Sequence, residues 1–386
     1  MLNVGIIGCG NAGNQVCALC ATRYPDIPVI AINCSENDMQ SLPASVTKFL
    51  IGDGRGAGKN REEAKEFLEG SIMEFVSDAS VRDMLKDLDI VYIVSSTGGG
   101  TGSGISVLLA NVIKSVCADA EQPVLPILVG ILPTLKEALA TQANTLSYLN
   151  ELYVLTDDPV YMLYDNEKYA KESTINMMEK INSAIVEDIN VMRGFYNVNT
   201  VFSSIDEKDA FTILASPGRL VITRVEDIKE KDLDEDTDIE DLLVNEIKRG
   251  PHTELQLDGI VNRIGVITNL SKNLIDNFDT TVAKVRNLVG DPVEQFEHIG
   301  VNDDRKDTNR VMLIIAGLTK VNDRIAKIND RIDEINEVQK KKEDDSELDM
   351  DRLRSVQQKR TYRKNVENAG NVFKVDLSSI FNKFKS

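Results

Sequence analysis

The chain has 386 residues, enough to bury a large core, which predicts two domains. Its hydrophobic content of 42% is ordinary for a globular protein. The formal net charge of −18 argues against a body that wraps nucleic acid, although a local basic patch is left open.

The cysteines and histidines are poorly placed for metal or nucleophilic chemistry. Cys17 and Cys20 form a C-x-x-C pair, but both fall on one expected helix and no second ligand pair follows. The histidines, His252 and His298, lie far away in the sequence. We therefore expect no zinc site and assign no metal-ligating residue. The chain opens on an expected strand and has no apolar run of transmembrane length, so we expect a cytoplasmic protein with reduced thiols and no membrane partner.

Residues 2–7 are expected to form a strand, and a glycine-rich turn follows it. The turn leads into an apolar-faced helix that ends near residue 22, and it contains Gly8, Gly10, Asn11, Ala12, Gly13 and Asn14. Such a GxGxxG-like pattern is weak support for a dinucleotide site, which also needs an acidic residue at the end of the second strand. The expected second strand, residues 28–32, ends in Asn33, which lowers the case for a dinucleotide site.

A second glycine-rich loop covers residues 51–60. Its candidate nucleotide-binding residues are Gly56, Ala57, Gly58, Lys59 and Asn60. Arg55 and Lys59 are able to offset phosphate charge, with a solvated loop as the alternative. Residues 61–85 then have a helical pattern.

The most informative stretch is residues 95–104, between an expected buried strand at 90–94 and an apolar-faced helix at 105–113. A strand, a glycine loop and a helix present backbone N–H groups to an anion, and the helix N-terminus adds about half a positive charge. The loop does not fit the Walker pattern, because no Gly-Lys-Ser/Thr follows it. Its candidate phosphate-binding residues are Thr97, Gly98, Gly99, Gly100, Thr101 and Gly102.

This loop resembles the Gly-Gly-Gly-Thr-Gly-Ser/Thr-Gly signature of the tubulin/FtsZ superfamily. The resemblance implies that GTP or GDP is the ligand, and that the two earlier glycine loops and Asn33 also line the nucleotide. An expected strand at 124–132 ends in Pro133, and the resemblance places Glu137 against the ribose hydroxyls. A carboxylate can accept hydrogen bonds from two hydroxyls, although a glutamate in a first helical turn is the alternative.

Guanine recognition is assigned to asparagine side chains. The resemblance gives this role to Asn166, because an amide offers a donor and an acceptor at once. Apolar residues at three- and four-residue steps predict an amphipathic helix from about residue 173 to 193. It resembles the superfamily's central helix, and either Asn176 or Asn182 would supply a second contact to guanine.

The catalytic candidates are Asp206 and Asp209, which match two acidic positions of the family at the start of a helix. Their spacing would place both on one helical face, and capping the helix is the alternative role. Ser204 stands where the family has asparagine. The resemblance implies that this segment reaches the nucleotide of the next subunit. A carboxylate there would orient or deprotonate the attacking water, while Mg²⁺ stabilises the phosphoryl transition state.

The remaining chain shows no further chemistry. We expect a short strand at 153–155, a helix at 271–288 and strands at 218–223, 261–269 and 311–316. From Val321 onward, apolar residues at steps of four and three predict a long helix. A basic run between residues 352 and 364 and an amphipathic peptide at 375–385 follow it.

The fold implied is α/β. It has a Rossmann-type parallel-sheet GTPase domain at 1–172, a central helix at 173–195, an α+β activation domain at 196–318, and a long helix with a tail at 319–386. The C-terminal pattern is most similar to the TubZ and phage tubulin group.

This likeness implies an assembly-dependent GTPase in a bacterial or phage-infected cytoplasm. It would polymerise head-to-tail and move or segregate plasmid or phage DNA, with its tail held by a DNA-bound adaptor protein. Direct contact with DNA is left open. The alternatives are a phage spindle tubulin that positions replicating phage DNA, an FtsZ-like division-ring protein and, least favoured, a Rossmann NAD-type enzyme.

Overall fold

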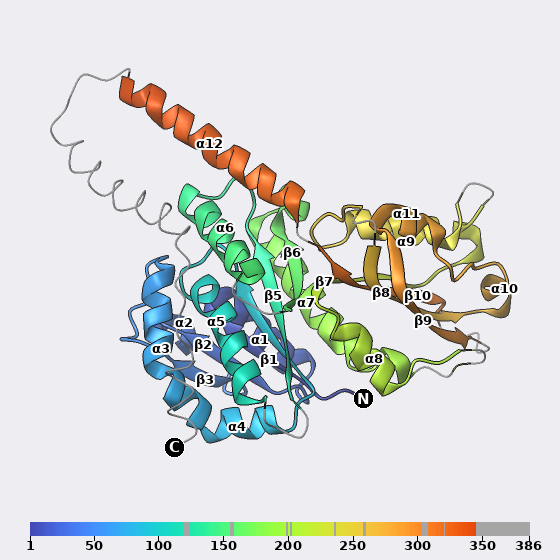
Figure 1. Ribbon diagram of the computed structural model, residues 1–386, viewed down its shortest axis with the longest axis horizontal. Helices are drawn as coiled ribbons and strands as arrows, with labels where there is room; N and C mark the ends of the chain where they lie inside the picture. Colours follow the sequence, from blue (N-terminus) through green and yellow to red (C-terminus); the bar gives the residue numbers. More distant parts are fainter. Residues whose placement is uncertain are drawn as a thin grey trace. The chain divides into compact units, whose positions relative to one another are not determined.

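The computed structural model confirms the α/β class and shows one ten-stranded mixed sheet in the part of the chain that it describes (Figure 1). The described residues are 1–118, 123–154, 158–197, 200, 203–234, 237–257, 260–302, 308–319 and 321–344.

Six strands belong to the amino-terminal part: β1 (Val4–Cys9), β2 (Val29–Asn33), β3 (Thr47–Leu50), β4 (Ile90–Ser96), β5 (Leu125–Leu132) and β6 (Val160–Asp165). Four follow later: β7 (Gly218–Val225), β8 (Ile260–Leu270), β9 (Asp291–Val301) and β10 (Arg310–Leu318). β1, β2 and β6 are buried along their whole length, which is typical of parallel strands covered by helices on both faces.

The helices before the central one are α1 (Gly10–Arg23), α2 (Glu36–Gln40), α3 (Arg61–Ser77), α4 (Ala79–Lys86), α5 (Thr101–Val116) and α6 (Leu139–Val154). The central helix is α7 (Thr174–Met192). After it come α8 (Glu207–Leu214), α9 (Ile239–Arg249), α10 (Lys272–Ile275), α11 (Ala283–Val289) and α12 (Asn322–Asp344). Short 3₁₀ turns are η1 (Asn166–Tyr169), η2 (Phe195–Asn197) and η3 (Glu230–Asp232).

The strand order is β3-β2-β1-β4-β5-β6-β7-β10-β8-β9. The pairs from β3 to β7 are all parallel, whereas β10 runs antiparallel to both β7 and β8. β6 and β7 pair only through Val160 with Gly218 and Tyr161 with Arg219, so a narrow junction joins the two parts of the sheet. In an open parallel sheet of this kind, ligands bind beyond the carboxyl ends of the strands.

The central helix α7 is packed along one face of the sheet. Its buried residues Ile181, Ile185 and Ile189 belong to a core cluster that also contains residues of β1, β4, β6, β7 and β10. On the other face of the later strands, α9 and α11 form a second cluster with β7, β8 and β10 (Figure 1). Alternate residues of β7 belong to one cluster or the other, because successive side chains of a strand point to opposite faces of the sheet.

Two expected elements differ from the structure, and two of its strands were not expected. Tyr153 lies at the end of α6 rather than in a short strand. The expected helix at 271–288 is split into α10 and α11, because Asp279 accepts a hydrogen bond from the Thr281 amide and Val282 adopts a left-handed conformation. β3 and β9 were not expected. They are the two edge strands of the sheet, and β9 has exposed charged residues.

The chain separates into two compact units, one ending at Asn329 and the other starting at Asp330 within α12. The expected division of residues 1–318 into two domains and a central helix remains a prediction. The basic run between 352 and 364 and the peptide at 375–385 lie outside the described residues. Among the described helices, none is long and apolar enough to span a membrane.

Candidate functional site

The glycine loops after β1 and β4 lie back to back. A Cβ added to Gly10 would be 2.8 Å from the Gly102 amide nitrogen, and one added to Gly13 would be 2.1 Å from the Val94 carbonyl oxygen. The loop before α3 joins them, because a Cβ on Gly100 would lie 2.7 Å from the Cα of Lys59. The structure therefore brings together the three glycine loops that the sequence singled out.

One side of this cluster is open. A Cβ on Gly99 or on Gly58 would have no protein atom within 4 Å, whereas one on Gly98 or Gly100 would lie 2.3 or 2.7 Å from a neighbouring atom. The open side offers room for a ligand that approaches the backbone, as a phosphate does.

Two of the helices that begin at these loops, α1 and α5, have uncapped N-termini. Neither Cys9, before α1, nor Gly100, before α5, supplies a side chain to cap the helix. In contrast, side chains cap α2, α3, α4, α7, α8 and α9. The short α10 and α11 also lack a side-chain cap. Two adjoining long helices thus present backbone N–H groups and the positive ends of their dipoles at one place, which suits a polyanion.

Asn144 of α6 holds two of the loops together, a role that the sequence did not reveal. Its Nδ2 donates to the carbonyl oxygens of Lys59 at 3.1 Å, Gly98 at 3.3 Å and Gly99 at 3.0 Å. Lys59 itself has a positive φ of 64°, and its Nζ donates to Thr141 Oγ1 at 3.2 Å. A left-handed lysine is costly and persists only where the surroundings hold it.

Arg61, at the start of α3, is a second residue that the sequence did not single out. It is 5% exposed, and it donates to Ser103 Oγ at 3.1 Å and to the Ser103 carbonyl oxygen at 2.7 Å. Its guanidinium also pairs with Glu151 at 2.6 Å. The hydrogen bonds to Ser103 fix the start of α3 against the start of α5, and the ion pair with Glu151 ties it to α6. Asn60 caps α3 by accepting hydrogen bonds from the Glu62 and Glu63 amides.

Two of the candidate asparagines lie beneath the loops. With its amide oriented to satisfy its neighbours, Asn14 donates to the carbonyl oxygens of Gly8 at 2.9 Å and Gly10 at 3.2 Å. Its Oδ1 accepts a hydrogen bond from Asn33 at 3.2 Å. Asn14 and Asn33 are 0% and 1% exposed, so we interpret them as residues that support the loops from beneath. Asn11 is exposed in the first turn of α1.

The candidates for ribose and guanine lie on the loops after β5 and β6. Glu137 is half-buried, and its Oε1 accepts a hydrogen bond from the Thr134 amide at 3.0 Å. Asn166 is half-buried at the start of η1. Glu167 joins the two loops, because its Oε2 accepts a hydrogen bond from the Leu135 amide at 2.7 Å. On α7, Asn176 is exposed and Asn182 is half-buried.

Asp206 and Asp209 form a capping box at the start of α8. Asp206 Oδ1 accepts a hydrogen bond from the Asp209 amide at 2.8 Å, and Asp209 Oδ2 accepts one from the Asp206 amide at 3.3 Å. Asp206 is therefore the N-cap rather than a residue within the helix. Within the described residues, no hydrogen bond or ion pair joins either aspartate to the glycine loops of the same chain.

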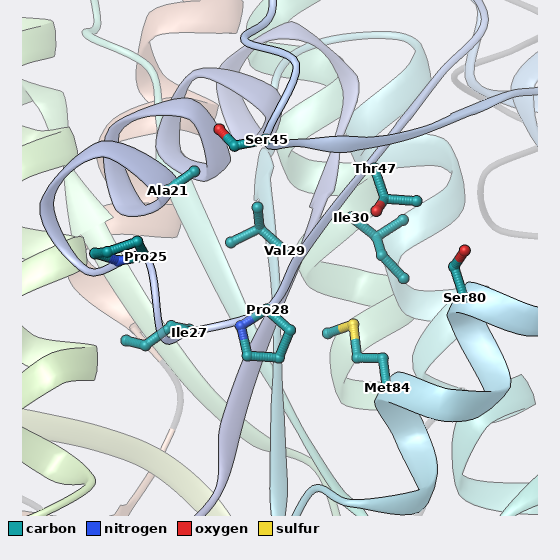
Figure 2. A pocket seen from close by; sticks show the side chains of 10 residues that line it. All are labelled: Ala21, Pro25, Ile27, Pro28, Val29, Ile30, Ser45, Thr47, Ser80 and Met84. Atoms are coloured by element: carbon teal, nitrogen blue, oxygen red, sulfur yellow. The ribbon is translucent and has the colours of Figure 1, made fainter.

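A cavity of about 260 Å³ lies elsewhere, at the amino ends of β2 and β3 (Figure 2). Pro28, Val29 and Thr47 line it together with Met84 of α4. The glycine loops follow the carboxyl ends of the strands, so this cavity is separate from them. We assign it no role.

Comparison with known proteins finds a family that part of the chain matches. Residues 3–174 match the Tubulin/FtsZ family, GTPase domain. Cell division protein FtsZ 1 of Methanocaldococcus jannaschii is 24% identical over 324 residues, which cover 82% of this chain and 83% of that protein. Tubulin-like protein TubZ of Clostridium botulinum C phage is 28% identical over 173 residues, which cover 44% of this chain and 45% of that protein.

A likeness in structure extends over more of the chain. CetZ2 of Haloferax volcanii, solved as a GTPγS-bound protofilament, is similar with a TM-score of 0.66 at 20% identity, over 87% of this chain and all of that one. This likeness shows the fold. The chain spans about half the length of several other curated relatives that it matches. The match to the GTPase domain of the tubulin/FtsZ family covers residues 3–174 of this chain, the part that contains all three glycine loops.

Proposed function

We propose that GTP binds at the joined glycine loops, with its phosphates at the N-termini of α1 and α5. The observation that carries this proposal is the adjoining pair of uncapped N-termini, which meet where Gly10 faces Gly102. Residues 10–13 and 97–102 hold the α- and β-phosphates, with Asn14 supporting the first loop from beneath, and residues 56–60 lie against the γ-phosphate.

The loops after β5 and β6 take the rest of the nucleotide. Glu137 accepts hydrogen bonds from the ribose hydroxyls, and its half-buried position leaves part of the carboxylate accessible. Asn166 reads guanine, together with Asn176 or Asn182 of α7. The placement of Asn166 and Glu137 on hydrogen-bonded loops supports a shared ligand.

A Rossmann NAD-type site is disfavoured by the end of β2. A dinucleotide site needs an acidic residue there, whose carboxylate accepts a hydrogen bond from the ribose hydroxyl. The residue is Asn33, which is 1% exposed and engaged with Asn14 and with Asp38 at 3.3 Å.

GTP hydrolysis is completed by a second copy of the chain. The capping box holds the carboxylates of Asp206 and Asp209 in fixed places at the exposed start of α8. In a head-to-tail filament these carboxylates face the γ-phosphate of the neighbour, where one of them orients or deprotonates the attacking water. Mg²⁺ bound with the nucleotide would be held mainly by phosphates and water, and it supplies charge stabilisation in the transition state.

In the cell, such filaments would move or segregate plasmid or phage DNA. The likeness to a phage TubZ and the long α12 support this role over that of an FtsZ-like division ring. A spindle that positions replicating phage DNA is the nearest alternative. The proposed partners are the chain itself and a DNA-bound adaptor that holds the tail.

Sedimentation and electron microscopy of the purified full chain test this function. We expect filaments with GTP, longer-lived filaments with GTPγS, and none with GDP or NAD. Assembly that ignores the nucleotide, or binding of NAD in preference to GTP, would contradict the proposal. A pull-down from plasmid- or phage-bearing cells that recovers no DNA-binding protein would count against the role in DNA movement.

A further inference from the structure

The first turn of α12 contacts the ends of β5 and β6. Arg324 and Ile328 lie one helical turn apart on the same face, and they are 6% and 0% exposed. The Arg324 guanidinium forms an ion pair with the carboxylate of Asp165 at the end of β6. Its Nε donates to Oδ2 at 2.8 Å and its Nη2 donates to Oδ1 at 3.1 Å. Asp165 is 4% exposed, so this forked ion pair is shielded from water.

The same guanidinium holds the loop after β5. Nη2 of Arg324 also donates to the Pro133 carbonyl oxygen at 2.5 Å. Pro133 begins the loop that carries Glu137, and Asp165 directly precedes Asn166. One side chain of α12 thus joins the two loops assigned to ribose and guanine.

Asp165 has a second task in the same place. Its Oδ1 accepts a hydrogen bond from the Glu167 amide at 3.0 Å and so caps η1, the turn that begins with Asn166. Burial raises the pKa of the Asp165 carboxyl, and the Arg324 guanidinium opposes that rise. Removing the guanidinium would leave a buried carboxylate without its cation and would release both loops.

We propose that Arg324 is a positioning residue for the ribose and guanine half of the nucleotide site. The start of α12 is then part of that site, and its docking is coupled to nucleotide binding. The inference rests on the proposed roles of Glu137 and Asn166. Because coupling is reciprocal, bound nucleotide holds the docked start of α12 as strongly as the docked helix favours nucleotide. The phosphates bind elsewhere, at α1 and α5, so the effect is confined to one half of the ligand.

The test compares Arg324→Gln with the wild-type full chain in titrations of GTP, GDP, ITP and 2′,3′-dideoxy-GTP. ITP lacks the guanine amino group, and the dideoxy nucleotide lacks the ribose hydroxyls. We expect the variant to bind GTP about tenfold more weakly or worse, as loss of a charge-assisted contact implies. It should lose the preference for GTP over ITP and over the dideoxy nucleotide, yet keep the ratio of GTP to GDP affinity.

Arg331→Gln is the matched control, because that arginine pairs with Glu334 of the same helix at 3.0 Å. It should behave as the wild type. A folded Arg324→Gln chain with wild-type affinities and preferences overturns the inference while leaving the proposed function standing. A wild-type chain that binds no GTP overturns both.

A second measurement covers the case in which Arg324→Gln does not fold. Hydrogen exchange of the wild type, at a protein concentration too low for assembly, should slow at residues 322–329 when GTP is added. Unchanged exchange at these amides, with GTP shown to be bound, overturns the inference.

Discussion

Gly10 and Gly102 meet so closely that a Cβ on Gly10 would lie 2.8 Å from the Gly102 amide nitrogen. Gly10 begins α1 and Gly102 lies in the first turn of α5. Only the absence of side chains allows the two helix starts to approach in this way. Their combined N–H groups therefore act on one ligand rather than on two.

Gly10→Ala should destabilise the protein and abolish most nucleotide binding. The position has a φ of +70°, and the added methyl group would press on backbone that has no room to move. We expect a loss of roughly 2 kcal/mol or more in the free energy of unfolding, from left-handed strain and the clash together. Urea unfolding and GTP titration measure both effects.

Gly70→Ala is the matched control, because a Cβ there meets open space inside α3. It should raise stability by about 0.5–1 kcal/mol. Equal unfolding midpoints for the two variants would show that the contact with Gly102 is not rigid.

Gly99→Ala separates binding from folding. A Cβ at Gly99 has no protein atom within 4 Å, so the free energy of unfolding should change by less than about 0.5 kcal/mol. The methyl group would instead occupy space on the open side of the loop, and GTP affinity should fall about tenfold, as for the loss of a close backbone contact. Unaltered affinity would exclude Gly99 from contact with the nucleotide.

Asn144→Ala should loosen the loops without touching the nucleotide. It removes the donor shared by the carbonyl oxygens of Lys59, Gly98 and Gly99. We expect KM for GTP to rise about tenfold, with a loss of about 1–2 kcal/mol in stability. Steady-state kinetics measure the first effect. Asn150→Ala, at an exposed position of the same helix, should have no effect on either quantity.

Asp206→Ala should slow turnover in filaments while leaving GTP binding by single subunits intact. The expected loss in turnover is roughly a hundredfold, the usual contribution of a positioned general base. Filaments should persist longer. Phosphate release and light scattering follow the two consequences.

Asp238→Ala controls for the lost helix cap, because Asp238 and Asp241 form the same capping box on α9. Each variant should lose about 1 kcal/mol of stability. If Asp238→Ala slows hydrolysis as much as Asp206→Ala does, the effect comes from general destabilisation.

Thiol labelling should report burial and its dependence on pH. Burial raises the pKa of the Cys20 thiol to about 12 and also raises those of Cys9, Cys17 and Cys34. Because the thiolate is the reactive form, these four should resist a disulfide reagent at pH 8 in the native protein. Half-buried Cys117 should react first, and faster as the pH rises. Cys117→Ser should leave a native protein that reacts only on unfolding, and rapid labelling of Cys17 and Cys20 would contradict their placement in the core.

The sequence by itself determined the strand–glycine–helix units and the central helix. The central helix α7 and a glycine loop after β4 were predicted correctly, because apolar periodicity reports on one buried face and glycine content on local backbone. The helix after that loop begins at Thr101, four residues earlier than expected. The same local signals failed for β9, whose exposed charges belong to a sheet edge. They also failed at 271–288, where an aspartate turn and a left-handed valine interrupt the helical pattern.

Only the tertiary structure decided which side chains support the site. Asn144 reaches Lys59 across 85 residues of sequence, and Arg324 reaches Asp165 across 159. Neither residue carries a local signature, since each is a polar position on an amphipathic helix. Asn144 and Arg324 reach their partners because helices distant in the sequence pack at the carboxyl ends of the parallel strands. Burial of apolar surface between segments far apart in the sequence determines this packing.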